Sequence, residues 1–519
     1  MSFQTTVTMA KPVLRASRGM VAAQHSGAAE VGAEILRGGG NAVDAAIATS
    51  LALAVLEPWM SGLGGGGFLV LAKADGQTEV LDFGMKAPVA LDPAAYPLSD
   101  GRDSDLFGWP GVVEDRNVMG PLSVAVPGQA AGLELAFERH ASLPWRDLCA
   151  PAIALAERGL PIGWHASLQI TTAAADLARF EAAGRHFLPN GMPPVPDGNG
   201  GASYLPTLSL AQTLRRLADV GPGDLISGEL AHLLVEDVRA AGGVLSVEDL
   251  VGHPARVTDP LLHRHGDTQI QSPGGLTAGP TLDHALDLIA GKVGAGKPDA
   301  AAYVAWADAL FEAYRHRLAH LGHASDGAGS RAGCTSHFCV VDAQGTMVSL
   351  TQTLLSAFGS KILSPRTGIL LNNGIMWFDP RPGGPNALAP GRRPLSNMCP
   401  AVARRDGAPW LTIGASGGRR IMPAVLQIAS MLIDGGLDLE SAFHLPRIDV
   451  SGGPEVNADP RLAPEILAAL EQRFTVQPRA AMVWPKLFAC PSAILREPGS
   501  GEAFGMTDPM QPMAGAVAA

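Results

Sequence analysis

The chain of 519 residues lacks the features that mark several large classes of protein. Its five cysteines are odd in number and share no spacing typical of a zinc site or a disulfide framework, so we read them as reduced thiols. No window approaches the roughly 18 consecutive apolar residues of a transmembrane helix. No block of Lys and Arg is present, and the formal net charge of -11 repels polyanions. Nucleic acids and acidic membrane surfaces are therefore not expected as partners.

The chain also shows no secretory signal, internal repeat or low-complexity segment. Residues 1–19 carry no apolar segment after their charges, which predicts a cytoplasmic protein. A hydrophobic content of 47% is ample for a core, while 62 Gly and 41 Pro predict many tight connections. This composition is typical of a soluble enzyme that acts on a small molecule, and we expect no cofactor and no metal.

A glycine-rich run follows two predicted helices near the N-terminus. Residues 27–56 indicate a helix, a stop at residues 38–40, a cap at Asn41 and a second helix. The run at residues 61–68 then leads into a strand-like segment. A phosphate-binding loop is excluded because its Lys-Ser/Thr pair is absent, and the order helix then strand is the reverse of a dinucleotide fingerprint. We therefore predict that these glycines allow close backbone packing.

Thr335 is the first candidate for chemistry. It opens an alternating, strand-like run and follows the small, polar residues 324–334. If the bond between Cys334 and Thr335 breaks, the free α-amino group can accept the proton of the threonine hydroxyl, so one residue supplies nucleophile and base. An ordinary strand-opening threonine is the competing interpretation. A second strand is predicted at residues 347–353, so the nucleophile would head a hairpin.

A rival motif lies at residues 414–418, where Gly-Ala-Ser-Gly-Gly matches the G-x-S-x-G elbow of serine hydrolases. That mechanism needs an acid and then a histidine later in the chain. His444 is the only histidine after Ser416, and Asp434 and Asp438 come too close before it to occupy separate strand ends. The serine hydrolase is therefore disfavoured.

The same segment has a use in the self-cleaving mechanism. Adjacent glycines can direct two backbone N–H groups at an oxyanion, which makes Gly417 and Gly418 the candidate oxyanion hole. A glycine-rich helix entry without a catalytic role is the alternative.

Together these motifs resemble the γ-glutamyltransferase family of N-terminal nucleophile hydrolases, and the ordered matches extend along most of the chain. The matching stretches are residues 19–22, 39–46, 57–58, 61–68, 126–128, the Thr335 strand, 368–373, 393–398, 414–418 and 507–509.

The resemblance implies an α+β fold, a four-layer αββα sandwich that is made as one precursor. Cleavage between Cys334 and Thr335 would give a large chain, residues 1–334, and a small chain, residues 335–519. The two chains would be intertwined as a heterodimer that forms one globular catalytic unit. Thr335 would be the nucleophile in both cleavage and catalysis.

The resemblance also assigns roles to single residues. Thr353 matches a second threonine that hydrogen-bonds the nucleophile, although a plain β-branched strand residue is the alternative. Ser396 and Asn397 match the pair that holds the substrate α-carboxylate, and Gly417 with Gly418 match the oxyanion glycines.

Four predicted pocket positions depart from the family pattern. Gly84 stands where the family has an arginine for the α-carboxylate, and a glycine cannot replace its bidentate fork. Leu355, Gly374 and Trp377 stand where polar residues hold the α-amino group. Because an ammonium buried without a carboxylate costs several kcal/mol, we expect glutathione to be a poor substrate. Candidates to replace the arginine are Lys86, Arg392, Arg393 and Arg419.

The predicted function is thus acyl transfer from a γ-glutamyl-type amide, such as a glutathione-like donor, to water or an amine. One alternative resembles the cephalosporin acylases and takes a glutaryl group, a γ-glutamyl group without its α-amino substituent, or a neutral acyl group. A second alternative is a non-catalytic paralogue that only binds a ligand or partner.

Overall fold

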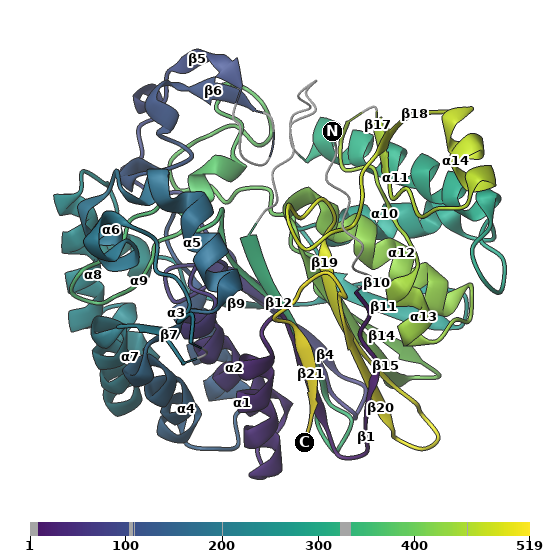
Figure 1. The fold of residues 1–519 in the computed structure, drawn as a ribbon, viewed down its shortest axis with the longest axis horizontal. Helices are drawn as coiled ribbons and strands as arrows, with labels where there is room; N and C mark the ends of the chain where they lie inside the picture. Colours follow the sequence, from purple (N-terminus) through teal and green to yellow (C-terminus); the bar gives the residue numbers. More distant parts are fainter. Residues whose placement is uncertain (1–8, 103–106, 108, 200, 322–333, 454) are drawn as a thin grey trace.

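The computed structural model describes residues 9–102, 107, 109–199, 201–321, 334–453 and 455–519. Two seven-stranded antiparallel sheets face each other and carry helices on their outer faces, giving the layers α, β, β and α (Figure 1). The predicted four-layer αββα sandwich is confirmed.

The first sheet contains the predicted nucleophile. Its strands, in spatial order, are β21 (Gly515–Ala518), β2 (Met20–Ala23), β12 (Cys334–Val341), β13 (Met347–Leu355), β3 (Gly66–Ala72), β4 (Thr78–Phe83) and β9 (Arg256–Thr258). The hairpin of β12 and β13 is the one that the sequence predicts, and it lies at the middle of the sheet, between β2 and β3.

The second sheet carries the glycine turn. Its strands, in spatial order, are β1 (Leu14–Ala16), β20 (Ala503–Thr507), β19 (Cys490–Arg496), β15 (Ala408–Ser416), β14 (Ala401–Arg405), β11 (Thr268–Pro273) and β10 (Pro260–His265). Small side sheets are formed by β5 (Leu98–Arg102) with β6 (Pro110–Val112), β7 (Leu160–Pro161) with β8 (Tyr204–Leu205), and β16 (Ile448–Asp449) with β17 (Glu455–Ala458) and β18 (Thr475–Pro478).

Helices cover both outer faces (Figure 1). On the side of the first sheet lie α1 (Ser26–Arg37), α2 (Ala42–Leu56), α3 (Gln129–His140), α4 (Trp145–Arg158), α5 (Trp164–Leu177), α6 (Glu181–Phe187), α7 (Leu208–Val220), α8 (Glu229–Ala240) and α9 (Val247–Val251). On the side of the second sheet lie α10 (Gly279–Ile289), α11 (Ala300–His320), α12 (Ile421–Ile433), α13 (Leu439–His444) and α14 (Pro464–Glu471).

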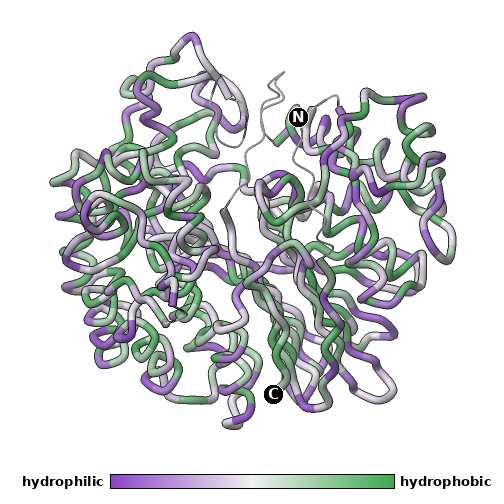
Figure 2. Tube along the Cα trace, viewed as in Figure 1, coloured by the Kyte–Doolittle hydropathy of each residue, from purple (hydrophilic) through white to green (hydrophobic). Residues whose placement is uncertain are grey.

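Helix α2 illustrates how the helical layer on the first sheet is built. Asn41 caps it, as the sequence predicts, and also forms a capping box with Asp44, and every residue of the helix is buried. Apolar side chains concentrate in the strands of both sheets (Figure 2). A separate apolar cluster fills the space between the sheets, where Cys339 and Val70 of the first sheet meet Ile494 of the second. Among the described residues, no helix is long and apolar enough to cross a membrane.

The glycine run of residues 61–68 serves close packing, as predicted. A Cβ at Gly65 would collide with the backbone oxygen of Thr353, and one at Gly67 with that of Thr351. Helix α2 precedes the run and β3 follows it. The glycines therefore bring β3 against β13 and cradle no phosphate.

Candidate active site

Thr335 lies at a β-bulge near the start of β12, where the pairing with β13 shifts between Cys334 and Ser336. Bulges re-aim single side chains and are frequent beside active sites. Thr335 is 4% exposed, and its Oγ1 lies 3.0 Å from Oγ1 of Thr353 on β13. The predicted small, polar segment 324–333 lies outside the described residues.

The backbone of β13 also binds this threonine pair. Oγ1 of Thr353 accepts a 2.8 Å hydrogen bond from the backbone N–H of Leu355 and makes the 3.0 Å contact with Thr335, in which either hydroxyl can donate. Leu355 has φ +84°, a rare value for a residue with a Cβ. This strained backbone aims the amide of Leu355 at Thr353. The backbone N–H of Leu355 thus helps to hold Oγ1 of Thr353 in position.

His337 is close to Thr335 in sequence and cannot serve as its base. Its Nδ1 lies 2.9 Å from Oγ1 of Thr351 and its Nε2 3.2 Å from Sγ of Cys339. Full burial lowers the pKa of His337 to about 3, so the ring is neutral. With both ring nitrogens engaged, the base that Thr335 needs must come from elsewhere, and its own α-amine would satisfy that need.

The stacking of the sheets places the glycine turn at the same end as Thr335. The side chain of Cys339 contacts Thr412, and the ring of His337 fills the space over Gly414. Thr335 and Ser416 are each two residues further along their strands in the same direction, so the turn that follows Ser416 and Thr335 lie toward the same end of the stacked sheets.

Gly417 and Gly418 form this turn and lead into α12. Their φ angles are +139° and +63°, and a Cβ at Gly417 would lie 2.8 Å from Cα of Ala489. Gly417 thus requires glycine, and Gly418 has the left-handed conformation that glycine adopts most easily.

His444, the histidine that the serine-elbow mechanism would need, is bound to other groups in the structure. Oγ of Ser416 accepts a hydrogen bond from Nε2 of Gln24, and Ser416 is 3% exposed. Nε2 of His444 accepts from the backbone N–H of Lys11, and its Nδ1 lies 2.8 Å from the backbone oxygen of Glu440. His444 is therefore committed to other partners.

A cavity of about 490 Å³ opens between the edges of the two sheets and the segment after β13. Its wall includes Gly84, Trp377 and Ser396, three of the predicted pocket residues. Met85 also lines it, and a Cβ on Gly66, which pairs with Thr353, would lie 3.2 Å from Met85. The cavity wall is thus one strand away from Thr353.

The remaining predicted pocket residues do not line the cavity and pack or form hydrogen bonds elsewhere. A Cβ on Gly374 would lie 2.7 Å from Sδ of Met85, so this glycine packs behind the wall. Oδ1 of Asn397 accepts from Nη2 of Arg317 at 3.2 Å. Leu355 packs in the apolar cluster that contains Met85 and Trp377. Of the residues assigned to substrate by resemblance, only Gly84, Trp377 and Ser396 line the cavity.

Arg393 is the candidate cation that enters the cavity. Its guanidinium binds both carboxylate oxygens of Asp82, and its Nη2 would lie 2.8 Å from a Cβ on Gly84. Arg419 instead stacks over Phe107 and Trp109, with Cζ 5.3 and 5.4 Å from their ring centres. Arg393 thus occupies the space that a side chain at position 84 would need.

Two buried ionisable residues were not predicted from the sequence to have a role. Arg317 on α11 is 2% exposed and donates to the backbone oxygens of Ser396 (2.6 Å) and Thr277 (2.7 Å). Burial lowers the pKa of Arg317 to about 10, which leaves it charged at neutral pH. It therefore fixes the segment that carries Ser396. No local pattern marks this arginine, because its partners lie far along the chain.

The second is Glu57, which caps the C-terminal end of α2 next to β12. It is fully buried, and its Oε1 lies 3.5 Å from Nε2 of Gln511. Burial raises the pKa of Glu57 to about 8, opposed by the Lys486 ammonium and the Ser336 hydroxyl. Glu57 is therefore largely protonated at neutral pH.

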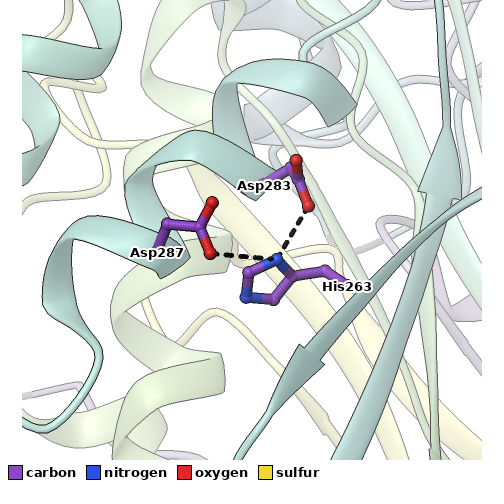
Figure 3. A group of neighbouring side chains, drawn as sticks. All are labelled: His263, Asp283 and Asp287. Carbon is purple, nitrogen blue, oxygen red and sulfur yellow. Dashed lines mark hydrogen bonds and ion pairs between the residues drawn. The ribbon is translucent and has the colours of Figure 1, made fainter.

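One group among the described residues has the ligand types of a metal site. Nδ1 of His263 on β10 lies 2.7 Å from Oδ1 of Asp283 and 3.9 Å from Oδ1 of Asp287, both on α10 (Figure 3). Asp287 is 73% exposed. A hydrogen bond between His263 and Asp283 accounts for this geometry without an ion. The group lies at the β10 edge of the second sheet.

Comparisons with known proteins agree with this geometry. The family model described as Gamma-glutamyltranspeptidase matches residues 28–326 and 320–518. The Acylase ACY 1 proenzyme of Pseudomonas sp. (strain SE83) is 33% identical over 91% of this chain and 90% of its own length. The Glutathione hydrolase proenzyme of Pseudomonas sp. (strain A14) is 30% identical over 95% of this chain and 93% of its own length.

A solved structure has the same fold over the whole chain. The cephalosporin acylase from Bacillus halodurans superimposes with a TM-score of 0.84 and covers 100% of this chain and 99% of its own, at 24% identity.

Proposed function

Because the chain belongs to the γ-glutamyltranspeptidase family of hydrolases and acyltransferases, we propose that it cuts itself before Thr335 and then uses Thr335 to transfer acyl groups from amides. The observation that carries the proposal is the contact of the Thr335 and Thr353 hydroxyls at the register shift between β12 and β13. The names of both relatives, which include the word proenzyme, support a precursor.

In the cleavage step, Oγ1 of Thr335 attacks the carbonyl carbon of Cys334. The C–N bond breaks, the nitrogen becomes the free amine of Thr335, and an ester joins Cys334 to the threonine oxygen. Water hydrolyses this ester and leaves a carboxylate on Cys334. The products are residues 1–334 and 335–519, which remain together as one heterodimer.

In catalysis, the α-amine of Thr335 takes the proton of its own hydroxyl while Oγ1 attacks the substrate amide carbonyl. Thr353 orients Oγ1, and the N–H groups of Gly417 and Gly418 bind the oxyanion. The leaving amine departs with the proton, and an acyl ester remains on Thr335. Water then releases an acid, or an acceptor amine releases a new amide, and the free enzyme returns.

The donor is a γ-glutamyl-type amide or, as a second candidate, an acyl amide without the α-amino group. The apolar side chains of Leu355 and Trp377 in the cluster around the cavity favour the second candidate, because an α-ammonium would lose its hydration there. Glutathione hydrolase and acylase are the names of similar relatives, which supports both candidates. A non-catalytic paralogue that only binds a ligand is disfavoured, because the hydroxyl groups of Thr335 and Thr353 form the hydrogen bond that the catalytic mechanism needs.

The test is turnover of γ-glutamyl, glutaryl and simple acyl anilides by the purified protein and by Thr335→Ala. We expect at least one anilide to be hydrolysed by the unmodified protein and none by the variant. Equal turnover by both proteins would contradict the role of Thr335.

A further inference from the structure

A second polar pair lies on the same two strands as Thr335 and Thr353. Ser336 follows Thr335 on β12, Gln352 precedes Thr353 on β13, and Ser336 and Gln352 are opposite each other in the strand register. Because successive side chains of a strand point to opposite faces, Gln352 points away from the face that carries Thr353. It hydrogen-bonds to Ser50 of α2, in the outer helical layer. The second pair thus lies on the helix-covered face of these strands.

Gln352 uses all of its hydrogen-bonding capacity. Its Oε1 accepts from Oγ of Ser50 at 2.6 Å and from Nε2 of Gln129 on α3 at 2.8 Å. Its Nε2 donates to Oγ of Ser61 at 3.0 Å and to the backbone oxygen of Ser50 at 3.5 Å. A glutamine amide has two acceptor sites and two donor hydrogens, and all four are engaged here. Gln352 is therefore a fixed point on β13.

Ser61 connects this fixed point to β12. It lies in the turn between α2 and β3 and is 1% exposed. Its Oγ accepts the hydrogen bond from Gln352 and donates to Oγ of Ser336 at 2.9 Å. One hydroxyl group thus ties together the residue that follows Thr335 and the residue that precedes Thr353.

Ser336 has a second polar neighbour. Its hydroxyl lies beside the carboxyl group of Glu57, and both residues are fully buried. Thr335 itself lies where the pairing of β12 with β13 shifts, between Cys334 and Ser336. A bulge leaves its extra residue outside the regular ladder, so the position of Thr335 depends on its neighbours. The contacts of Ser336 therefore help to set where Thr335 lies.

We propose that Ser61 is a positioning residue for the nucleophile, because it holds Ser336 against Gln352 and so keeps Oγ1 of Thr335 beside Thr353. The inference rests on the proposed acyl transfer by Thr335 and adds to it a residue on the other face of the sheet. Ser61 does not line the cavity of about 490 Å³. Its loss should therefore slow the steps that Thr335 performs and leave substrate binding almost unchanged.

The test is Ser61→Ala, assayed on whichever of the γ-glutamyl, glutaryl and simple acyl anilides the unmodified protein hydrolyses fastest. We expect kcat to fall by about tenfold or more, with KM within about threefold, because a small displacement of a nucleophile costs rate rather than binding. Self-cleavage uses the same hydroxyl, so a denaturing gel should show more uncut chain for Ser61→Ala than for the unmodified protein.

Ser430→Ala is the matched control. Ser430 on α12 is also fully buried, and its Oγ accepts from Nε1 of Trp306 at 3.2 Å and donates to Oδ2 of Asp434 at 2.7 Å. The change removes an equally buried hydroxyl group with two side-chain partners, but from the helical layer of the second sheet. It should leave kcat and cleavage unchanged.

Ser336 provides a second comparison that does not depend on Ser61. Ser336→Ala removes the hydroxyl group that Ser61 binds and should lower kcat as Ser61→Ala does. Ser336→Thr keeps a hydroxyl group on a residue type suited to strands and should restore most of the rate. If Ser61→Ala does not fold, this comparison decides, and equal kcat values for the two Ser336 variants would overturn the inference.

The outcomes separate the inference from the proposed function. A folded, processed Ser61→Ala protein with unchanged kcat, or an equal loss of kcat in Ser430→Ala, overturns the role of Ser61 and leaves that of Thr335 standing. Turnover that persists in Thr335→Ala contradicts the proposed function itself.

Discussion

The hydroxyl oxygens of Thr335 and Thr353 lie 3.0 Å apart across the hairpin of β12 and β13, and the backbone N–H of Leu355 donates a hydrogen bond to Oγ1 of Thr353. Either hydroxyl can donate in the hydrogen bond between the two threonines, and the contact holds Oγ1 of Thr335 in position. The α-amine that cleavage would free belongs to the same residue and can accept the proton of that hydroxyl.

Removal of the supporting hydroxyl tests this arrangement. Thr353→Ala should lower kcat by about tenfold or more, because Oγ1 of Thr335 loses the hydrogen bond that orients it. Thr353→Ser keeps the hydroxyl and should restore most of the rate. The measurement is kcat of the processed variants, and an unchanged kcat for Thr353→Ala would reduce Thr353 to a packing residue.

The glycine turn can be tested with a matched control. Gly418→Val should lower kcat by about 10²-fold, since loss of one oxyanion donor costs on the order of 3 kcal/mol. Gly436 has the same φ of +63° but lies exposed, with open space around its Cβ position. Gly436→Val therefore imposes a similar backbone strain and should keep kcat. Equal losses in both variants would assign the effect of Gly418 to strain.

Ser416 separates the two candidate mechanisms. Its hydroxyl is bound by Gln24, and both ring nitrogens of His444 are engaged elsewhere. Ser416→Ala should therefore retain substantial activity in a steady-state assay. Complete inactivation of a folded, processed Ser416→Ala protein would revive the serine hydrolase.

Glu57 should make stability depend on pH. Burial raises its pKa from 4.5 to about 8, so the stability it contributes is full below pH 4.5 and is lost as the pH rises toward 8. Relative to Glu57→Gln, the protein should lose up to about 1.4 kcal/mol of unfolding free energy per pH unit in this window.

Urea unfolding at several pH values measures this slope, in the Thr335→Ala background so that a single chain unfolds. Glu471→Gln, at an exposed residue of α14, is the control and should not change the slope. Parallel pH profiles for the protein and Glu57→Gln would show that Glu57 is ionised in the folded state.

The parts of the fold that the sequence predicts are those with local causes. Asn41 caps α2 through its own backbone neighbours, and the hairpin of β12 and β13 follows from alternation and a short turn. The glycine run could be assigned to packing because the order helix then strand excludes a phosphate loop.

The parts that escaped prediction depend on residues far apart in the chain. Arg393 and Asp82 are 311 positions apart, and only the folded chain shows that the guanidinium fills the space beside Gly84. Asn397 matches a substrate ligand by motif, yet its Oδ1 binds Arg317, 80 positions away. The positive φ of Leu355 coincides with the register shift between β12 and β13, which no periodicity reveals.

The most direct test of the account is the intact mass of the purified protein together with the N-terminal residue of each chain. The account predicts a chain that ends at Cys334 and a second chain of 519 − 334 = 185 residues that begins with Thr335, and a single uncut chain for Thr335→Ala. An active protein that remains a single chain of 519 residues would contradict it.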